Sequence, residues 1–224
     1  MPTTIESIRE DLERCRSANR PPKIFGAETH RFTLNPVVRN SVVTNFEAKH
    51  GIELPEDYRR FITELGNGGA GPFYGLFKFR EMDDGYSFQR WKENDGFVGT
   101  LAKPFPHTKP WNDVLEYPDE DENEDEDLYA AEVERIDEIY WNPRNVNGAI
   151  PICHQGCALR NWLVVTGPEA GNIWEDLRAD EGGLVPTKRK GKSRMTFLEW
   201  YNDWLHQAVA KLPKPTPKKG RTKP

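Results

Sequence analysis

Residues 148–183, GAIPICHQGCALRNWLVVTGPEAGNIWEDLRADEGG, decide the fold of this chain. They include the densest apolar run, residues 162–165, then a turn-rich insert, residues 167–171, and a second short run with a large aromatic, residues 172–174. Two β-prone runs about five residues apart, with glycine at both ends of the connection, predict a β-hairpin with a longer loop. A run this apolar is typical of a strand buried on both faces, so we expect the hairpin at the centre of the domain.

The composition bounds the class of protein. The chain has 224 residues and includes seven Trp, eleven Phe and seven Tyr, enough large side chains to fill the core of one domain. Three cysteines are too few, and uneven in number, for a disulfide framework. No apolar leader and no run of about 18 apolar residues is visible. We therefore expect a reduced, cytoplasmic protein with no membrane partner.

The net charge of −5 hides an uneven distribution. Residues 186–224 carry eleven Lys or Arg and two acidic residues, a local charge of +9. Residues 1–185 carry 20 basic and 34 acidic residues, a local charge of −14. An acidic body repels nucleic acid and attracts basic proteins, so the distribution favours a basic protein partner.

Residues 119–127 read DEDENEDED, eight acidic residues around a single Asn. A block of like charges is usually a solvated loop, and it can also serve as an electrostatic docking surface. An EF-hand calcium loop requires a central Gly, which this run lacks. We predict that this run and the acidic turn at residues 83–84 contact the partner. The predicted contact residues are Asp83, Asp84, Asp119, Glu120, Asp121, Glu122, Glu124, Asp125, Glu126 and Asp127.

Three helices are predicted before residue 70 from apolar residues at helical spacing. The first begins at a capping box formed by Thr3 and Glu6. The second has Pro36 at its first helical position and ends at Gly51. The third has Pro55 in its first turn.

The rest of the chain alternates extended and helical patterns. Residues 73–79, FYGLFKF, predict a strand, and residues 80–110 are expected to be loop-like. Residues 128–141 predict a helix, and a last helix begins at a capping box formed by Thr196 and Glu199.

Several separate stretches resemble one family. LPEDYRRFITELGNGGAGPFYGLFKF, residues 54–79, resembles the helix, glycine-rich turn and first strand of the SUKH superfamily, the SMI/KNR-type proteins. The stretch at 148–183 and TFLEWYNDWL, residues 196–205, resemble the later strands and terminal helix of that family. KPFPHTKPW, residues 103–111, looks like a linker of bacterial members. The resemblance covers most of residues 35–206.

This resemblance implies an α+β fold, with a mixed or mainly antiparallel sheet and helices packed around it. It also implies that the protein has no cofactor, catalyses no reaction and has no small-molecule substrate. The implied division is an N-terminal helix and linker (1–34), a SUKH-like domain (35–206) with the acidic insert 119–127, and a basic Pro/Lys-rich tail (207–224).

The family also implies two functions that depend on protein contacts. Bacterial members are similar to immunity proteins that bind and block a cognate toxin, often a nuclease. We therefore expect an immunity protein that neutralises a toxin domain by direct binding, with carboxylates that mimic phosphate. The alternative is a regulatory scaffold, because fungal members look like regulators of cell-wall synthesis.

Cys153, His154 and Cys157 are the strongest candidates for metal or nucleophile chemistry. Zinc requires about four N or S ligands, and His206 is the nearest downstream candidate. A cysteine nucleophile requires a partner base, and adjacent residues on a strand point to opposite faces. We expect a tight turn that carries two small buried cysteines, with no metal, cofactor or catalytic site. An enzyme that uses this cluster is the third hypothesis.

Trp174 and Asp176 share one face of the predicted strand. A buried Trp often requires an acceptor for its ring N–H, so we expect structural rather than acid–base roles for this pair.

Overall fold

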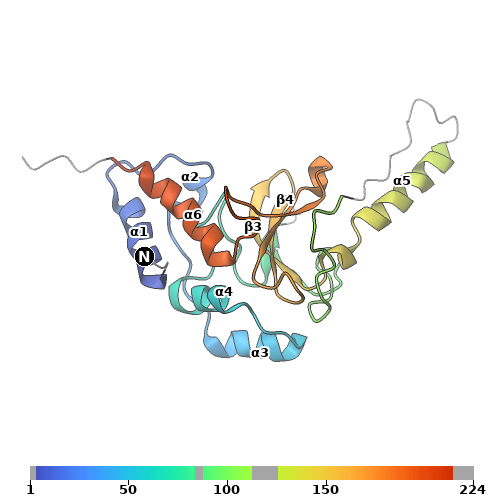
Figure 1. Cartoon of the computed structure of the whole chain (residues 1–224), viewed down its shortest axis with the longest axis horizontal. Helices are drawn as coiled ribbons and strands as arrows, with labels where there is room; N and C mark the ends of the chain where they lie inside the picture. Colours follow the sequence, from blue (N-terminus) through green and yellow to red (C-terminus); the bar gives the residue numbers. More distant parts are fainter. Residues whose placement is uncertain (1–3, 84–87, 113–125, 214–224) are drawn as a thin grey trace, which may run out of the picture.

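The structure is a computed structural model that describes residues 4–83, 88–112 and 126–213 (Figure 1). The helices are α1 (Ile5–Ser17), α2 (Ala27–His30), α3 (Asn40–His50), α4 (Glu56–Arg60), α5 (Glu126–Tyr140) and α6 (Phe197–Ala210). The strands are β1 (Glu81–Asp83), β2 (Phe88–Arg90), β3 (Ala149–Gly156), β4 (Leu159–Val164), β5 (Ile173–Asp176) and β6 (Leu184–Pro186). Figure 1 shows helices α1, α3, α4 and α6 around one side of the body and α5 projecting from the other. The expected α+β class is confirmed.

The stretch at 148–183 forms most of a four-stranded antiparallel sheet in the order β3-β4-β5-β6. β4 and β5 are the predicted hairpin, with Trp162 opposite Trp174 and Leu163 opposite Ile173. All four side chains are buried. β3 and β6 extend the hairpin on its two sides, so the hairpin lies at the centre of the sheet as predicted.

The strand predicted at residues 73–79 is wrong. Phe73 and Gly75 have left-handed backbone conformations, with φ of 52° and 103°, which interrupt the alternation that a strand requires. The segment pairs with β3 through an isolated bridge between Leu76 and Cys153 and a hydrogen bond from the Phe77 N–H to the Ile152 carbonyl (2.8 Å), not through a continuous ladder. A side chain at Gly75 would place its Cβ 2.3 Å from a backbone oxygen, so the tight turn requires glycine here.

The loop predicted at residues 80–110 contains a short antiparallel pair. Strands β1 and β2 pair with Glu81 opposite Arg90, and β1 packs against β3. Three-residue strands are too short to give a clear alternating pattern, so the sequence shows only the turn signals around them.

Helix α1 buries the predicted stripe, but its cap is displaced by one residue. Thr4, not Thr3, is the N-cap, and its hydroxyl accepts from the backbone N–H of Ser7 (3.1 Å). The Ser7 hydroxyl accepts in return from the Thr4 N–H (3.0 Å), the role predicted for Glu6. The buried stripe consists of Ile5, Ile8, Leu12 and Cys15.

Helix α3 begins at Asn40, four residues after the predicted start at Pro36. The backbone N–H of Val38 donates to the carbonyl of Ile62 (2.8 Å), and Arg39 is extended with ψ of 136°, so the helix begins only after this tertiary contact. Gly51 ends the helix with φ of 63°, as predicted.

Helix α6 begins at the predicted capping box. The Thr196 N–H donates to the Glu199 carboxylate (3.0 Å), and Asp57 accepts from the N–H of Leu198 (3.1 Å). The buried face of α6 packs against α1 and α4. It consists of Phe197, Trp200, Tyr201, Leu205 and Ala208. Within the described residues, no helix is long and apolar enough to cross a membrane.

His30 is expected to make stability depend on pH. The ring is only 8% exposed, its Nδ1 accepts from the backbone N–H of Phe32 (3.0 Å), and burial lowers the pKa of His30 from 6.5 to about 4. The unfolded chain therefore binds the proton first as pH falls, so stability is lost between pH 6.5 and 4. Urea unfolding followed by tryptophan fluorescence should show a lower midpoint at pH 5 than at pH 7.

His30→Asn is the matched variant, because its side-chain oxygen can accept the same hydrogen bond but does not titrate in this range. We expect a smaller change in midpoint between the two pH values. Burial also lowers the pKa of His107, so part of the dependence should remain. Equal changes in the wild type and in His30→Asn would contradict the assignment to His30.

Candidate functional site

The predicted contact residues are only partly placed by the structure. Glu126 and Asp127 form the first turn of α5 and are exposed. Asp83 ends β1, which packs against β3, so it belongs to a different part of the molecule. The others, Asp84, Asp119, Glu120, Asp121, Glu122, Glu124 and Asp125, lie outside the described residues.

Helix α5 continues the acidic run well beyond residue 127. Six of its fifteen residues are acidic and one, Arg135, is basic, which gives the helix a charge of −5. Four of the six acids were not among the predicted contacts, although helix and charges could both be recognised in residues 128–141. We call α5 with its six acids the acidic arm. Those acids are Glu126, Asp127, Glu132, Glu134, Asp137 and Glu138.

The charges of the acidic arm work against the stability of the helix that carries them. Glu134 and Glu138 are one turn apart, a spacing at which like charges destabilise a helix. Asp137 and Glu138 lie in the last turn, at the negative end of the helix dipole, and that turn has no basic residue. Glu132 pairs with Arg135 (2.7 Å), whereas Glu134 and Glu138 form no ion pair within the described residues. Charges that destabilise their own helix are expected where those charges serve a function.

Arg178 supplies the positive charge that the last turn of α5 lacks. Its Nη1 donates to the carbonyl of Tyr140 (3.0 Å), and its guanidinium carbon lies 4.9 Å from the centroid of the Trp141 ring. Arg178 is buried, and it forms a two-point ion pair with buried Asp176, at 2.8 and 2.6 Å. The indole N–H of Trp162 donates to the same carboxylate (3.0 Å). We call these five residues the Arg178 clamp.

The side chain of Tyr140 makes a second set of contacts that holds the C-terminal end of α5, the base of the acidic arm. Its hydroxyl donates to Asn112 (2.9 Å), and its ring stacks on Trp111 at 5.6 Å between centroids. Burial raises the pKa of Tyr140, so the hydroxyl stays a donor. The Asn145 amide donates to the carbonyls of Ile139 and Tyr140 (2.9 and 3.1 Å). The C-terminal end of α5 is therefore held to the body of the protein, while Figure 1 shows the rest projecting away from it.

The cysteine cluster does not form the expected pair of buried residues. Cys153 is buried in β3, where its thiol donates to the carbonyl of Pro72 (3.2 Å) and burial raises its pKa. Cys157 is exposed, contrary to the prediction, because it lies at the tip of the turn between β3 and β4 with φ of 48°. In the part of the chain that the structure describes, no three His, Cys, Asp or Glu side chains converge as metal ligands.

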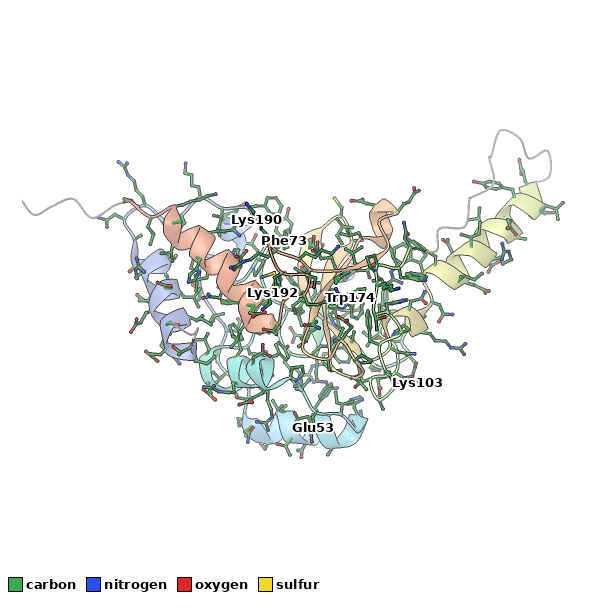
Figure 2. All side chains as sticks on the ribbon, in the orientation of Figure 1. Glu53, Phe73, Lys103, Trp174, Lys190 and Lys192 are labelled. Carbon is green, nitrogen blue, oxygen red and sulfur yellow. The ribbon has the colours of Figure 1, made fainter. Side chains whose placement is uncertain are left out.

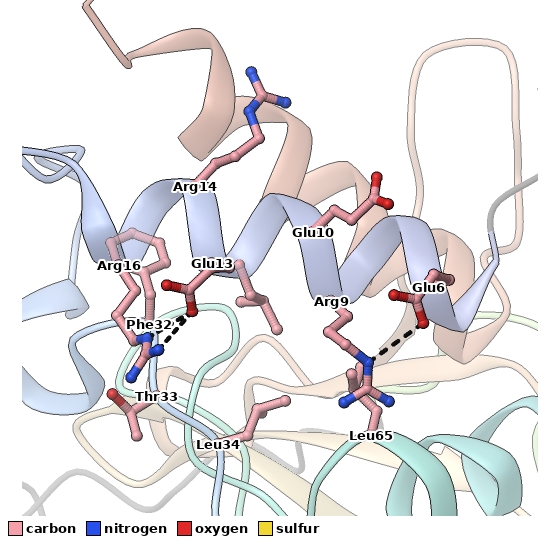
Figure 3. A pocket seen from close by; sticks show the side chains of 11 residues that line it. Glu6, Arg9, Glu10, Glu13, Arg14, Arg16, Phe32, Thr33, Leu34 and Leu65 are labelled. Atoms are coloured by element: carbon pink, nitrogen blue, oxygen red, sulfur yellow. Dashed lines mark hydrogen bonds and ion pairs between the residues drawn. The ribbon is translucent and has the colours of Figure 1, made fainter.

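A hollow of about 740 Å³ beside α1 carries many charges that are already paired (Figure 3). Arg16 pairs with Glu13 (2.6 Å) and Arg9 with Glu6 (3.4 Å), in each case along the same helix. Exposed pairs of this spacing are common surface features with small energies. The hollow is therefore a weaker candidate than the acidic arm.

Comparison with curated proteins and with solved structures gives no match. The profile of the SMI1 / KNR4 family (SUKH-1) matches residues 38–186, more than half of the chain. The matched range contains the acidic arm, the Arg178 clamp and the central sheet, and it confirms the resemblance derived from the sequence. The chain therefore belongs to the SMI1 / KNR4 family (SUKH-1).

Proposed function

We propose that this protein is an immunity protein that neutralises a basic toxin domain, such as a nuclease, by stoichiometric binding through the acidic arm and without catalysis. Domains of its family are known as protein-interaction modules, which supports a binding role. The observation that carries the proposal is the charge of −5 on a fifteen-residue helix, with acids even in its C-terminal turn.

A basic partner would relieve the repulsion that the isolated arm contains. Cationic side chains placed beside Glu134 and Glu138 would convert a destabilising pair of like charges into attractive contacts. A nuclease needs positive charge to bind phosphates, and the arm presents carboxylates to that charge. Long-range attraction between the two proteins would raise the rate of association.

The Arg178 clamp favours tight binding because it orders the base of the arm before the partner arrives. Tyr140 and Trp141 are held by Arg178, which pairs with Asp176 of β5, and by Asn112, before any partner binds. A helix that is already positioned loses less conformational entropy on binding than a free segment.

Charge reversal on the arm tests the proposal. The protein is co-expressed with the product of the neighbouring gene, and affinity is measured by surface plasmon resonance at several salt concentrations. Glu134→Lys combined with Glu138→Lys should weaken binding by at least about tenfold, mainly through slower association, and should reduce its salt dependence. Inhibition of the toxin by the wild type should be complete at equimolar ratio.

The matched control is Glu10→Lys combined with Glu53→Lys, which changes the net charge equally at exposed positions away from α5 (Glu53 is labelled in Figure 2). It should leave affinity within about threefold of the wild type. Equal losses in the two variants would show that the arm is not the contact. A complex that leaves the toxin fully active would instead favour the regulatory scaffold.

A further inference from the structure

A second surface lies along α6, on the side of the molecule away from the acidic arm (Figure 1). It is a groove of about 700 Å³, which we call the α6 groove. Large apolar side chains from separate segments line it: Phe25, Phe73 and Leu159, with Trp200 and Trp204 of α6. Aromatic rings gathered in a concave surface are typical of sites that bind a peptide side chain.

The mouth of the α6 groove exposes aromatic surface to solvent. Phe25 is 63% exposed, and its ring contacts the edge of Tyr74, which is itself 39% exposed, at 5.1 Å between centroids. Two adjoining exposed aromatic residues are unusual for a surface that only faces water, and they suit the anchor region of an interface.

The rim of the α6 groove is basic. Lys211 lines it and donates to the backbone carbonyl of Lys23 (3.3 Å). Asp203 also lines it, but its charge is compensated by Arg189 (2.8 Å), whose neighbour in the sequence is the exposed Lys190. Within the described residues, Lys23, Lys190 and Lys211 have no carboxylate partner. Once the pairing of Asp203 with Arg189 is counted, Lys211 is the uncompensated charge of the lining, and Lys23 and Lys190 add positive charge beside its contacts, opposite to the charge of the arm.

We propose that the α6 groove binds an acidic peptide segment with a large apolar side chain, supplied by a protein other than the one that binds the acidic arm. The apolar side chain would lie against Phe25 and Trp204, and carboxylates on either side of it would pair with Lys190 and Lys211. The two surfaces of this chain have opposite charge, so they select different partners. A polyanion such as single-stranded nucleic acid could also stack on aromatic rings, so a labelled oligonucleotide is included in the test below.

A phage-displayed library of random peptides, panned on the full chain, tests the groove without a known partner. The enriched peptides should combine acidic residues with one aromatic or leucine residue. The most enriched peptide is then synthesised with a fluorescent label for anisotropy titrations. Lys190→Glu combined with Lys211→Glu should weaken its binding by at least about tenfold, and Phe25→Ser should weaken it similarly.

The matched control is Lys103→Glu combined with Lys109→Glu, which changes the net charge equally at exposed lysines on another segment. Figure 2 shows Lys103 well apart from Lys190. This control should bind like the wild type, and thermal unfolding should confirm that every variant is folded.

Three results would overturn the proposal. The first is the absence of enrichment, or enrichment of neutral or basic peptides. The second is equal weakening by the Lys190/Lys211 and Lys103/Lys109 variants. The third is tighter binding of a labelled single-stranded oligonucleotide than of the selected peptide, which would assign the groove to nucleic acid. None of these results depends on whether the acidic arm binds a toxin.

Discussion

Arg178→Ala is expected to destabilise the protein by about 3–5 kcal/mol, because it leaves a buried charge without its partner. Asp176 is 3% exposed and would retain only the indole N–H of Trp162 and a backbone N–H as donors. The carbonyl of Tyr140 would also lose the guanidinium at the C-terminal end of α5. Equilibrium unfolding in urea measures the loss, and amide hydrogen exchange should become faster along α5.

Two further variants distinguish the contribution of the Asp176–Arg178 ion pair to stability from other effects of the substitution. Replacing Asp176 with Leu and Arg178 with Met together should recover much of the stability, because apolar residues of similar volume often replace a buried pair at little cost. Arg135→Ala removes an exposed pair with Glu132 and should have a far smaller effect. If Arg178→Ala were as mild as Arg135→Ala, the clamp would not hold the arm.

The central hairpin and the caps of the helices could be predicted because their signals are local. Trp162 and Trp174 lie in apolar runs joined by a glycine-bordered connection, and this pattern is complete within the stretch itself. Thr196 and Glu199 are three residues apart, so their reciprocal hydrogen bonds depend on little else.

The predictions from the sequence are wrong where tertiary contacts outweigh the local conformational preference of the residues. Pro36 is a good first residue for a helix, yet Val38 is hydrogen-bonded to Ile62, and α3 starts later. Phe73 occurs in a β-prone sequence, yet its φ of 52° belongs to a tight turn packed beside β3. Ile62 and β3 both lie outside the short stretches of sequence on which these two predictions were based.

In the candidate site, too, local features could be predicted from the sequence and long-range contacts could not. The acids at residues 132–138 were visible in the sequence as a charge excess at helical positions. The clamp could not be predicted, because Arg178 and Tyr140 are 38 residues apart and are brought together by the sheet. The sequence placed Trp174 and Asp176 on one face of a strand, but the indole N–H that donates to the Asp176 carboxylate is that of Trp162.

Trp174→Ala is expected to cost about 3–5 kcal/mol, through the cavity that it leaves at the centre of the sheet. The side chain is fully buried opposite Trp162, and its ring lies 4.9 Å from that of Phe105. Its indole N–H donates to Glu169 (3.3 Å), but Glu169 also accepts from Arg194 (2.5 Å). The charge of Glu169 therefore stays compensated in the variant, so lost packing should dominate the change in unfolding free energy.

Trp174→Phe and Phe88→Ala complete this experiment. Trp174→Phe keeps part of the ring volume and loses the N–H, so its loss of stability should lie between those of the wild type and Trp174→Ala. Phe88 is 69% exposed, and Phe88→Ala should change the unfolding free energy by no more than about 0.5 kcal/mol. A Trp174→Ala protein as stable as Phe88→Ala would contradict a core position for Trp174. The sheet that holds Asp176 and Arg178 would then lack the packing that positions the acidic arm.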